Sequence, residues 1–328
     1  MYCINCGKTL IEGANFCAAC GARVRRENKG AAPERTMSSL ERRLNIPRSR
    51  AGELGREAAE ISRRGEYQAP SGRTVSIAGL VQVAVSRTLS YPPGEDPPSS
   101  DRDPVESHIT VENTTTLAAA KRLNDDGGDA VVLNFASATA PGGGFRKGSR
   151  AQEEYLARSS ALFACLEHNE MYSYHRARHD ALYTDYVIYS PGVPVFRNDD
   201  GELLEEPYRV GMLTSPAVYA KHVEPSRHSA IEPAMRARIR KVLAVGLAHG
   251  HLDIVLGAWG CGAFGNDPGL IAKLFGDALR GPFAGWLPAR DLRGYRLVLG
   301  ATVHRAVHAG VWPSVGKGRP RVAHRAPA

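Results

Sequence analysis

The sequence predicts an α/β fold in which one central sheet has helices on both faces. Two segments, 129–138 (DAVVLNFASA) and 251–260 (HLDIVLGAWG), are typical of buried strands because Val, Ile and Leu follow one another with little polar interruption. Helical spacing follows each of them, over 150–166 and 269–280. Buried strands that alternate with helices indicate a sheet covered by helical layers.

The other expected elements follow from the same two patterns. Residues 48–64 place Leu54, Ala58 and Ile61 at helical spacing, and residues 74–88 are rich in β-branched side chains. The remaining expected elements are a short strand and a helix within 108–123, strands at 185–197 and 208–218, a helix near 231–248 and a strand at 295–303. No internal repeat is present.

Composition favours a loop-rich globular protein. The chain has 328 residues, 43% of them apolar, with 34 glycines and 21 prolines. No apolar run approaches the roughly 18 residues of a membrane helix, and the start MYCINCGK lacks the apolar core of a signal peptide. We therefore expect a soluble cytoplasmic protein without membrane contact. Separately, we expect a monomer.

The formal charge of +8 is concentrated in two segments. Residues 21–50 carry a net charge of +6 and residues 311–328 a net charge of +4, which leaves −2 for residues 51–310. We interpret 24–47 as a basic linker and 311–328 as a basic tail. Two readings stay open for them: solvated flexible segments, or a weak, salt-sensitive attraction to nucleic acid or another polyanion.

Four of the six cysteines form a zinc-ligand pattern within residues 1–23. Two C-x2-C pairs each point two thiolates at one ion, and a glycine follows each pair, where the turn commonly needs a positive φ. Four thiolates match tetrahedral zinc, and disulfides are disfavoured in a chain without an export signal. The predicted ligands of this structural zinc ribbon are Cys3, Cys6, Cys17 and Cys20.

Two glycine-rich loops follow predicted strands. The loop Gly142–Gly144 does not continue into a phosphate P-loop, because its lysine precedes the later glycine. The loop 260–265 (GCGAFG) fits G-x-G-x-x-G, but Gly300 and Ala301 stand where a dinucleotide fold needs a ribose-binding acid. A dehydrogenase is therefore disfavoured. Glycines at a strand end still expose backbone N–H groups that suit a pyrophosphate.

Two adjacent acids, Glu153 and Glu154, follow the first loop. We interpret Ser149 and Gln152 as an S-x-x-Q capping box, which places both acids in the first turn of a helix. Consecutive helical residues point about 100° apart, so the two acids need different roles. From these residues alone, proton chemistry and simple complementation of the helix dipole both stay open.

Three blocks resemble the poly(ADP-ribose) glycohydrolase family, in particular its compact microbial branch. They are NFASATAPGGGFRKGSRAQEEYLARSSALF, SPGVPVFRND and LGAWGCGAFGNDP, at 134–163, 190–199 and 256–268. The resemblance covers about 48–310, and it implies a macrodomain-like three-layer α/β/α fold with a mixed central sheet. The small four-cysteine zinc ribbon at the N-terminus lies outside the usual pattern of this branch.

The resemblance also implies roles for individual residues. Glu154 would act as general acid and base, first on the departing ribose hydroxyl and then on water, and Glu153 would hold ribose hydroxyls. The loop 260–265 would wrap the diphosphate. The substrate-binding residues implied in this way are Asn134, Gly142, Gly143, Gly144, Gln152, Gly260, Cys261, Gly262, Ala263, Phe264, Gly265 and, for adenine, Glu112.

The resemblance implies an enzyme that hydrolyses ribose–ribose bonds of poly(ADP-ribose), preferentially from chain ends, without a metal in the chemistry. The alternatives are a non-catalytic ADP-ribose reader, a hydrolase of ADP-ribose linked to nucleic acid or protein, and a zinc-ribbon nucleic-acid binder. A zinc protease is disfavoured because His175 and His179 lack the glutamate of H-E-x-x-H. We expect both histidines at the surface.

Overall fold

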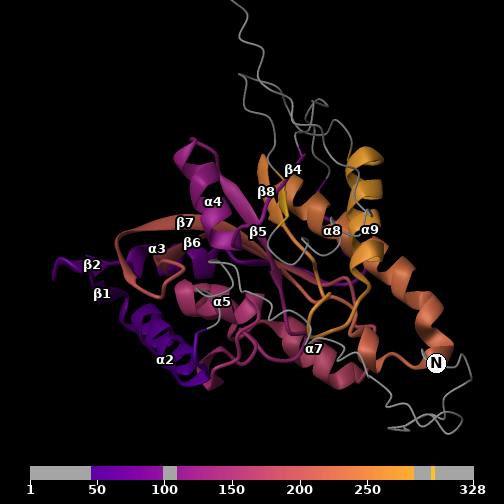
Figure 1. Ribbon diagram of the computed structural model, residues 1–328, viewed down its shortest axis with the longest axis horizontal. Helices are drawn as coiled ribbons and strands as arrows, with labels where there is room; N and C mark the ends of the chain where they lie inside the picture. The colour runs from indigo at the N-terminus through magenta and orange to yellow at the C-terminus, as the bar shows by residue number, and fades with distance from the viewer. Residues whose placement is uncertain (1–45, 99–108, 284–296, 300–328) are drawn as a thin grey trace, which may run out of the picture. The chain divides into compact units, whose positions relative to one another are not determined.

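The computed structural model describes residues 46–98, 109–283 and 297–299. All of them belong to one of two compact units of the chain, residues 42–328. The predicted zinc ribbon 1–23, almost all of the linker 24–47 and the tail 311–328 lie outside the described residues. Figure 1 draws the described elements as ribbons.

The elements alternate along the chain much as the sequence predicts. The first group is α2 (Arg48–Arg64), β1 (Glu66–Gln68), β2 (Thr74–Ser76), α3 (Ala78–Ser86), β3 (Leu89–Tyr91), β4 (Ile109–Val111), α4 (Thr116–Asp125), β5 (Ala130–Phe135), the 3-10 turn η1 (Phe145–Lys147), α5 (Gln152–Ser159), α6 (Leu162–Leu166) and α7 (Glu170–Arg178). The second group is β6 (Val187–Arg197), β7 (Leu203–Ser215), η2 (Ala220–His222), η3 (Pro225–Ala230), α8 (Ile231–Ala248), β8 (Asp253–Leu256), α9 (Pro268–Arg280) and β9 (Leu297–Leu299).

The main sheet is mixed. Within the described residues it has seven strands in the order β3-β6-β7-β5-β8-β9-β4, and β1 and β2 form a separate two-stranded sheet. The strands β7, β5, β8, β9 and β4 run parallel to one another, whereas β6 pairs antiparallel with both β3 and β7. The prediction of a mixed central sheet is confirmed.

Helices cover both faces of this sheet, as predicted. The fully buried strand β5 shows how the faces divide, because successive side chains of a strand point to opposite sides. Ala130 and Val132 pack into a cluster with α2 to α7, whereas Val131 and Leu133 pack against α8 and α9. In Figure 1, α8 and α9 lie next to each other, to the right of β8. The result is a three-layer α/β/α arrangement.

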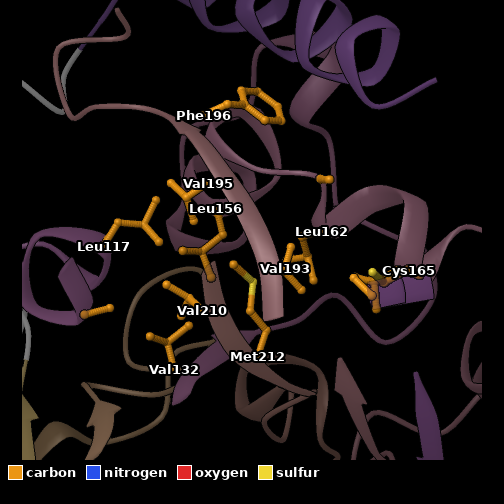
Figure 2. Close-up of a cluster of buried hydrophobic side chains, with 14 of the residues drawn as sticks. Leu117, Val132, Leu156, Leu162, Cys165, Val193, Val195, Phe196, Val210 and Met212 are labelled. Atoms are coloured by element: carbon orange, nitrogen blue, oxygen red, sulfur yellow. The ribbon is translucent and has the colours of Figure 1, made fainter. Parts of the chain in front are cut away.

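The larger core cluster joins the sheet to α5 and α6. Figure 2 shows Leu156 from α5 beside Val195 from β6 and Val210 from β7, with Leu162 from α6 close by. Each fully buried apolar side chain of this kind contributes about 1.5–3 kcal/mol to folding. The helix α5, which carries both acids, is therefore fixed in position by its packing against this core cluster.

The expected β-rich region 74–88 is wrong for most of its length. Only Thr74–Ser76 forms a strand, and Ala78–Ser86 is the helix α3. Val81 and Ala84, three residues apart, are buried on one side of it, while Val83 and Val85 stay exposed. Tertiary burial at helical spacing overrides the β propensity of these valines.

The expected helix 150–166 is two helices. Ser160 leaves helical geometry with φ −147° and ψ 175° and forms an isolated antiparallel bridge with Val195 of β6. Its hydroxyl donates to the carbonyl of Leu156 at 2.8 Å and accepts from the backbone N–H of Leu162 at 3.2 Å. The Ser160 side chain thus forms hydrogen bonds with backbone groups that would otherwise pair within a continuous helix, which explains why α5 and α6 are separate.

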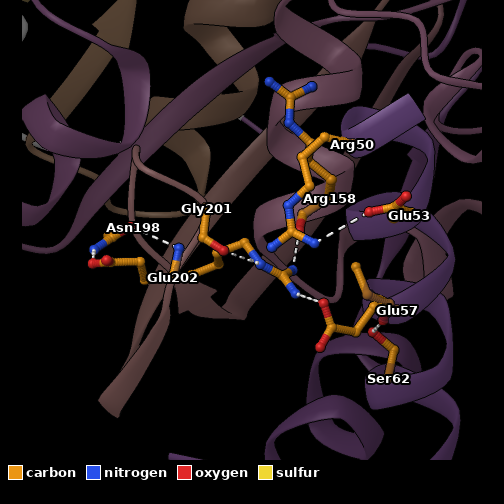
Figure 3. A network of polar contacts seen from close by, with 10 residues as sticks. Arg50, Glu53, Glu57, Ser62, Arg158, Asn198, Gly201 and Glu202 are labelled. Carbon is orange, nitrogen blue, oxygen red and sulfur yellow. Dashed lines mark hydrogen bonds and ion pairs between the residues drawn. The ribbon is translucent and has the colours of Figure 1, made fainter. Parts of the chain in front are cut away.

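A buried arginine joins α2 to the turn between β6 and β7. Arg197 donates through Nη2 to Glu57 at 2.6 Å, through Nε to the carbonyl of Gly201 at 3.0 Å and through Nη1 to the carbonyl of Arg158 at 2.6 Å. Figure 3 shows this network together with the Arg50–Glu53 pair on α2. Each of the three guanidinium nitrogens therefore donates a hydrogen bond.

The helix α2 also supports the segment that precedes α5. Arg56 Nη1 donates to the carbonyl of Arg146 at 3.1 Å. A Cβ on Gly55 would lie 2.3 Å from the carbonyl oxygen of Phe145. The backbones of α2 and η1 are therefore too close together for a side chain at this position. No helix in the described part of the chain is both long and apolar enough to cross a membrane.

Candidate active site

A pocket of about 410 Å³ lies at the carboxyl edge of the parallel strands. Because β4, β9, β8 and β5 run parallel, the loops that follow them emerge at the same edge. Residues 114–116 follow β4, residues 135–137 end β5, and residues 256–260 end β8; all three segments line the pocket. Residues of the first turn of α5 also line the pocket.

Glu154 is buried at this wall. Its side chain is 8% exposed, and Oε1 accepts a hydrogen bond from the backbone N–H of Gly144 at 2.9 Å. The other oxygen, Oε2, is buried and has no hydrogen-bond partner within the described residues. Glu154 thus presents one fixed oxygen and one unsatisfied oxygen in a pocket wall.

Glu153 is more deeply buried, at 3% exposure. Its Oε2 accepts from the backbone N–H of Ser137 at 2.7 Å, and its Oε1 has no partner among the described groups. Burial raises the pKa of the Glu153 carboxyl well above its usual range; the Ser137 N–H opposes this rise, and the charge of Glu154 adds to it. Glu153 therefore favours its neutral form more than an exposed glutamate does.

The triple glycine is explained by these two acids. Gly142 and Gly143 have φ values of 67° and 58°, which L side chains rarely adopt. A Cβ on Gly143 would lie 2.3 Å from Glu154 Oε1 and 2.9 Å from Glu153 Oε2. Although adjacent residues of a helix point apart, both carboxylates reach this one glycine. The loop therefore lies directly on the acids.

The side chain of Gln152 ties α5 to the end of β5. Its Oε1 accepts from the N–H of Phe135 at 2.9 Å, and its Nε2 donates to the carbonyl of Leu133 at 2.8 Å. The predicted capping box is wrong, because Ala151 is the N-cap and no side chain caps it. Gln152 is instead used to pair backbone groups of β5, although both acids do lie in the first turn.

The loop 260–265 forms the facing wall. Gly260, Gly262, Ala263 and Phe264 line the pocket, and Gly260 has a positive φ of 73°. Nothing lies within 4 Å of a Cβ built on Gly262, so the backbone there is open. Phe264 stacks on Tyr219 with ring centroids 4.6 Å apart. Such a loop can bring backbone N–H groups close to a ligand.

A buried asparagine, Asn266, holds this loop and was not predicted. Its Nδ2 donates to the carbonyl of Val218 at 2.7 Å and to that of Gly260 at 3.2 Å. Its own N–H also donates to Gly260 at 3.1 Å. The only sequence signal was its position directly after the last glycine of the loop.

Several predicted substrate-binding residues do not line the pocket. Asn134 is fully buried and donates through Nδ2 to Thr214 Oγ1 at 3.2 Å. Glu112 pairs with Arg122 at 2.7 Å. Cys261 bonds weakly to the carbonyl of Trp259, and burial raises the pKa of its thiol to about 12. The three glycines of the first loop and Gly265 also lie outside the lining.

The pocket contains side chains that the sequence did not single out. Tyr155 donates to Asp199 and, at 3.3 Å, to Thr115 Oγ1; Thr115 also donates to Asp199 at 2.9 Å. The pKa of the Tyr155 phenol is raised well above its usual range by burial and by the charge of Asp199. The lining also contains two charged residues that were not predicted, Arg150 and Arg158.

The expectation of surface histidines is wrong for His175. It is buried on the inner side of α7, where its Nε2 accepts from the backbone N–H of Thr184 at 3.2 Å. Burial and the charge of Arg238 lower its pKa to about 4. His175 is therefore a neutral core residue that holds the segment after α7.

Fold and site together define a three-layer α/β/α protein with two buried carboxylates in a pocket between glycine-rich loops. The family model described as microbial-type PARG, catalytic domain matches residues 55–198, and a zinc-ribbon domain model matches residues 2–24. No curated protein sequence matches the chain.

Solved structures give the same result. Poly(ADP-ribose) glycohydrolase from Thermomonospora curvata is 44% identical with a TM-score of 0.72, and the match covers 80% of this chain and all of that chain. The same enzyme bound to the inhibitor ADP-HPD is 44% identical with a TM-score of 0.69, over 77% and 94% of the two chains. The enzyme from Deinococcus radiodurans in complex with ADP-ribose is 35% identical with a TM-score of 0.61, over 69% and 92%. The chain belongs to the microbial-type poly(ADP-ribose) glycohydrolase family, as its sequence predicts, and is a glycoside hydrolase.

The four cysteines of the zinc-ribbon match lie outside the described residues. Their donor set, four thiolates in two C-x2-C pairs, fits one tetrahedral zinc ion and leaves no open coordination position. Within the residues that the structure describes, no group of three or more His, Cys, Asp or Glu side chains could hold a metal.

Proposed function

We propose that this protein hydrolyses the ribose–ribose glycosidic bonds of poly(ADP-ribose) and so reverses ADP-ribosylation. The observation that carries the proposal is the convergence of Glu153 and Glu154 on Gly143 inside a pocket between two glycine-rich loops. Family members of known structure have been solved with ADP-ribose and with ADP-HPD, which supports an ADP-ribose-sized ligand here. A cavity of about 410 Å³ is within the range of small-molecule sites.

Glu154 is the proposed general acid and base. In the first step its proton goes to the departing ribose hydroxyl as the bond to the anomeric carbon breaks. In the second step the resulting carboxylate takes a proton from the water that adds to that carbon, which restores the acid. Positive charge develops on the sugar in between, and a nearby carboxylate stabilises it.

The environment of Glu154 supports this assignment. The Gly144 N–H fixes one oxygen at 2.9 Å, and the unsatisfied oxygen is left for a ligand or water. Glu153 is the proposed partner of ribose hydroxyls, because a neutral carboxyl can both donate and accept hydrogen bonds. The loop 260–265 is the proposed diphosphate cradle.

The proposed action is from chain ends. The pocket volume of about 410 Å³ suits a single small-molecule unit, which supports a terminal ADP-ribose as its occupant. The basic segments and the zinc ribbon are proposed to favour a particular polyanionic target, without a part in the chemistry.

The first experiment is release of ADP-ribose from purified poly(ADP-ribose), separated by chromatography, with the wild type and Glu154→Gln. Loss of general acid and base catalysis lowers turnover by roughly 10²–10⁴-fold. Glu206→Gln is the matched control, because that side chain is 85% exposed and pairs only loosely with Arg73. Glu154→Gln is expected to keep its affinity for ADP-ribose.

The products decide between the alternatives. Free ADP-ribose from the first time point supports action at chain ends, whereas early oligomers contradict it. A wild type that binds ADP-ribose but releases nothing would be a reader, or would act on ADP-ribose linked to protein or nucleic acid, and these become the next substrates to assay.

A further inference from the structure

Arg158 lies on the same helix face as the proposed catalytic acid. It stands four residues after Glu154 in α5, so the two side chains are neighbours on the helix surface and about 6 Å apart along its axis. Both residues line the pocket. Arg158 is only 4% exposed, which is unusual for a side chain with a permanent charge.

The guanidinium of Arg158 lacks the partners that a buried charge normally has. Its Nη1 is buried without a hydrogen-bond acceptor among the described residues. No carboxylate of the described residues forms an ion pair with it, and its guanidinium carbon lies 5.5 Å from the centre of the Tyr155 ring. The residue takes part in the network of Figure 3 through its carbonyl, not through its charge.

Other buried arginines of this fold are satisfied, which makes Arg158 an exception. Arg197 forms an ion pair with Glu57 and donates to two carbonyls. Arg238 donates through Nε to the carbonyl of Thr184 at 2.9 Å and through Nη2 to that of Leu182. The buried arginines that connect structural elements, Arg197 and Arg238, thus have hydrogen-bond acceptors. Arg158, in the pocket wall, has a buried Nη1 without one.

A buried cation without a partner is costly to the folded state, by several kcal/mol before relaxation. A ligand that brings an anion removes this cost when it binds, so the site is preorganised for that anion. The planar guanidinium fork matches phosphate geometry better than a lysine would. Two phosphate-contacting regions then serve one pocket: the backbone of the loop 260–265 and the side chain of Arg158.

We infer that Arg158 is a phosphate-binding residue of the pocket. The inference rests on the proposed function for the identity of the phosphate, which belongs to poly(ADP-ribose). Two sources share this chemistry: the diphosphate of the ADP-ribose unit held in the pocket, and the diphosphate of the next unit across the bond that is cleaved.

The competing explanation is that Arg158 only balances the charge of Glu154. Glu154 does act on Arg158 electrostatically, but the guanidinium of Arg158 has no ion pair with a carboxylate of the described residues, and its buried Nη1 has no acceptor among them. Charge balance alone predicts a changed pH–rate profile with unchanged affinity for phosphate ligands. Phosphate binding predicts a loss of affinity that depends on the phosphate of the probe.

The test is calorimetric titration of the full chain with adenosine, pyrophosphate, ADP-ribose and a poly(ADP-ribose) fragment. The variants are Arg158→Met, which keeps the length of the side chain without its charge, and Arg158→Lys, which keeps the charge without the fork. Arg227→Met is the control, since Arg227 is half exposed and pairs with Asp180. Polymer binding is measured in the Glu154→Gln background, so that the polymer is not consumed.

Arg158→Met is expected to weaken a phosphate-bearing ligand by about 10- to 100-fold, as for a lost charge-assisted hydrogen bond. Adenosine affinity stays the same, Arg158→Lys recovers part of the loss, and the control changes nothing. The unfolding midpoint of Arg158→Met stays the same or rises, because an unpaired buried charge is removed. A structural role would instead lower that midpoint.

The two sources separate in the same data. Weaker binding of ADP-ribose identifies the diphosphate of the bound unit, and weaker binding of the polymer alone identifies the next unit. The inference is overturned if neither affinity falls, or if all ligands, adenosine included, are lost together with stability. If Arg158 proves necessary for ADP-ribose binding while the wild type releases nothing from the polymer, the proposed function fails and this inference stands.

Discussion

Gly143 lies against Glu154 so closely that a single added methyl group would overlap the carboxylate, with its carbon 2.3 Å from Oε1. The same atom would lie 2.9 Å from Oε2 of Glu153. The position of both acids therefore depends on the absence of a side chain at one residue of a neighbouring loop. This relationship connects a motif that looks purely conformational to the chemistry of the pocket.

Gly143→Ala is expected to lower release of ADP-ribose by at least about 10²-fold, because the carboxylates must move by an ångström or more. The positive φ of 58° adds a strain of roughly 1–2 kcal/mol. Gly72→Ala is a matched control, since Gly72 has a φ of 84° and open space around its Cβ. An equal loss of turnover in both variants would show that backbone strain, and not contact with the acids, governs the effect. Unchanged turnover in Gly143→Ala would contradict the prediction.

Glu153→Gln is expected to remove a pH dependence of stability. Since the folded pKa of Glu153 is raised, the folded state keeps its proton to a higher pH than the unfolded chain does. The free energy of unfolding therefore falls as pH rises from the ordinary glutamate pKa of about 4.3 up to the folded pKa. Urea unfolding between pH 4 and 8 measures this fall.

The glutamine variant should lack that part of the decrease and be more stable than the wild type at pH 8. Glu206→Gln, at an exposed position, should follow the wild type. A wild type and a Glu153→Gln variant with parallel curves would contradict the raised pKa.

The bond from Tyr155 to Asp199 is expected to couple the two residues. A hydrogen bond to a carboxylate contributes about 1.5–3 kcal/mol, so Tyr155→Phe should lower the free energy of unfolding by an amount in this range. A double-mutant cycle with Asp199→Asn should return a coupling of at least about 0.5 kcal/mol. Tyr208→Phe, which loses a bond to the neutral carbonyl of Leu117 at 3.2 Å, should cost less. Additive effects of the two changes would mean that Asp199 is held by Thr115 alone.

Removal of zinc is expected to leave turnover of free polymer within a few-fold. The two acids of the pocket, Glu153 and Glu154, lie in α5, and the described residues that line the pocket come from segments between 114 and 264. Metal analysis should find one zinc per chain before chelation and none after it. A complete loss of turnover, restored by added zinc, would show that the N-terminal cysteines support the catalytic part.

Patterns that depend on burial alone were predictable from the sequence. The strand Ala130–Phe135 and the helix Ile231–Ala248 appear where unbroken apolar runs and helical spacing placed them. The acids Glu153 and Glu154 were found because a triple glycine and a paired acid are a local signal. Such features need no knowledge of what lies across the sheet.

Features that depend on partners distant in the chain were not predictable. The break at Ser160 arises because Val195 of β6 pairs with it. The helix α3 replaces an expected strand because its Val81 and Ala84 find burial in the core. Arg158 and Asn266 have no local signature, since their importance lies in a missing partner and in a carbonyl of another segment. A side chain acquires such a role only when the tertiary structure decides what surrounds it.

Gly55 links a position far from the pocket to the catalytic loop of this protein. It belongs to the first described helix, almost 100 residues before the acids in the chain, and carries no group that could take part in chemistry. Yet any side chain there would push on the Phe145 carbonyl, and the loop displaced in this way is the one that lies on Glu154. A variant at such a position would look harmless by distance in sequence and by chemistry, and would still produce an inactive enzyme with an intact set of catalytic groups.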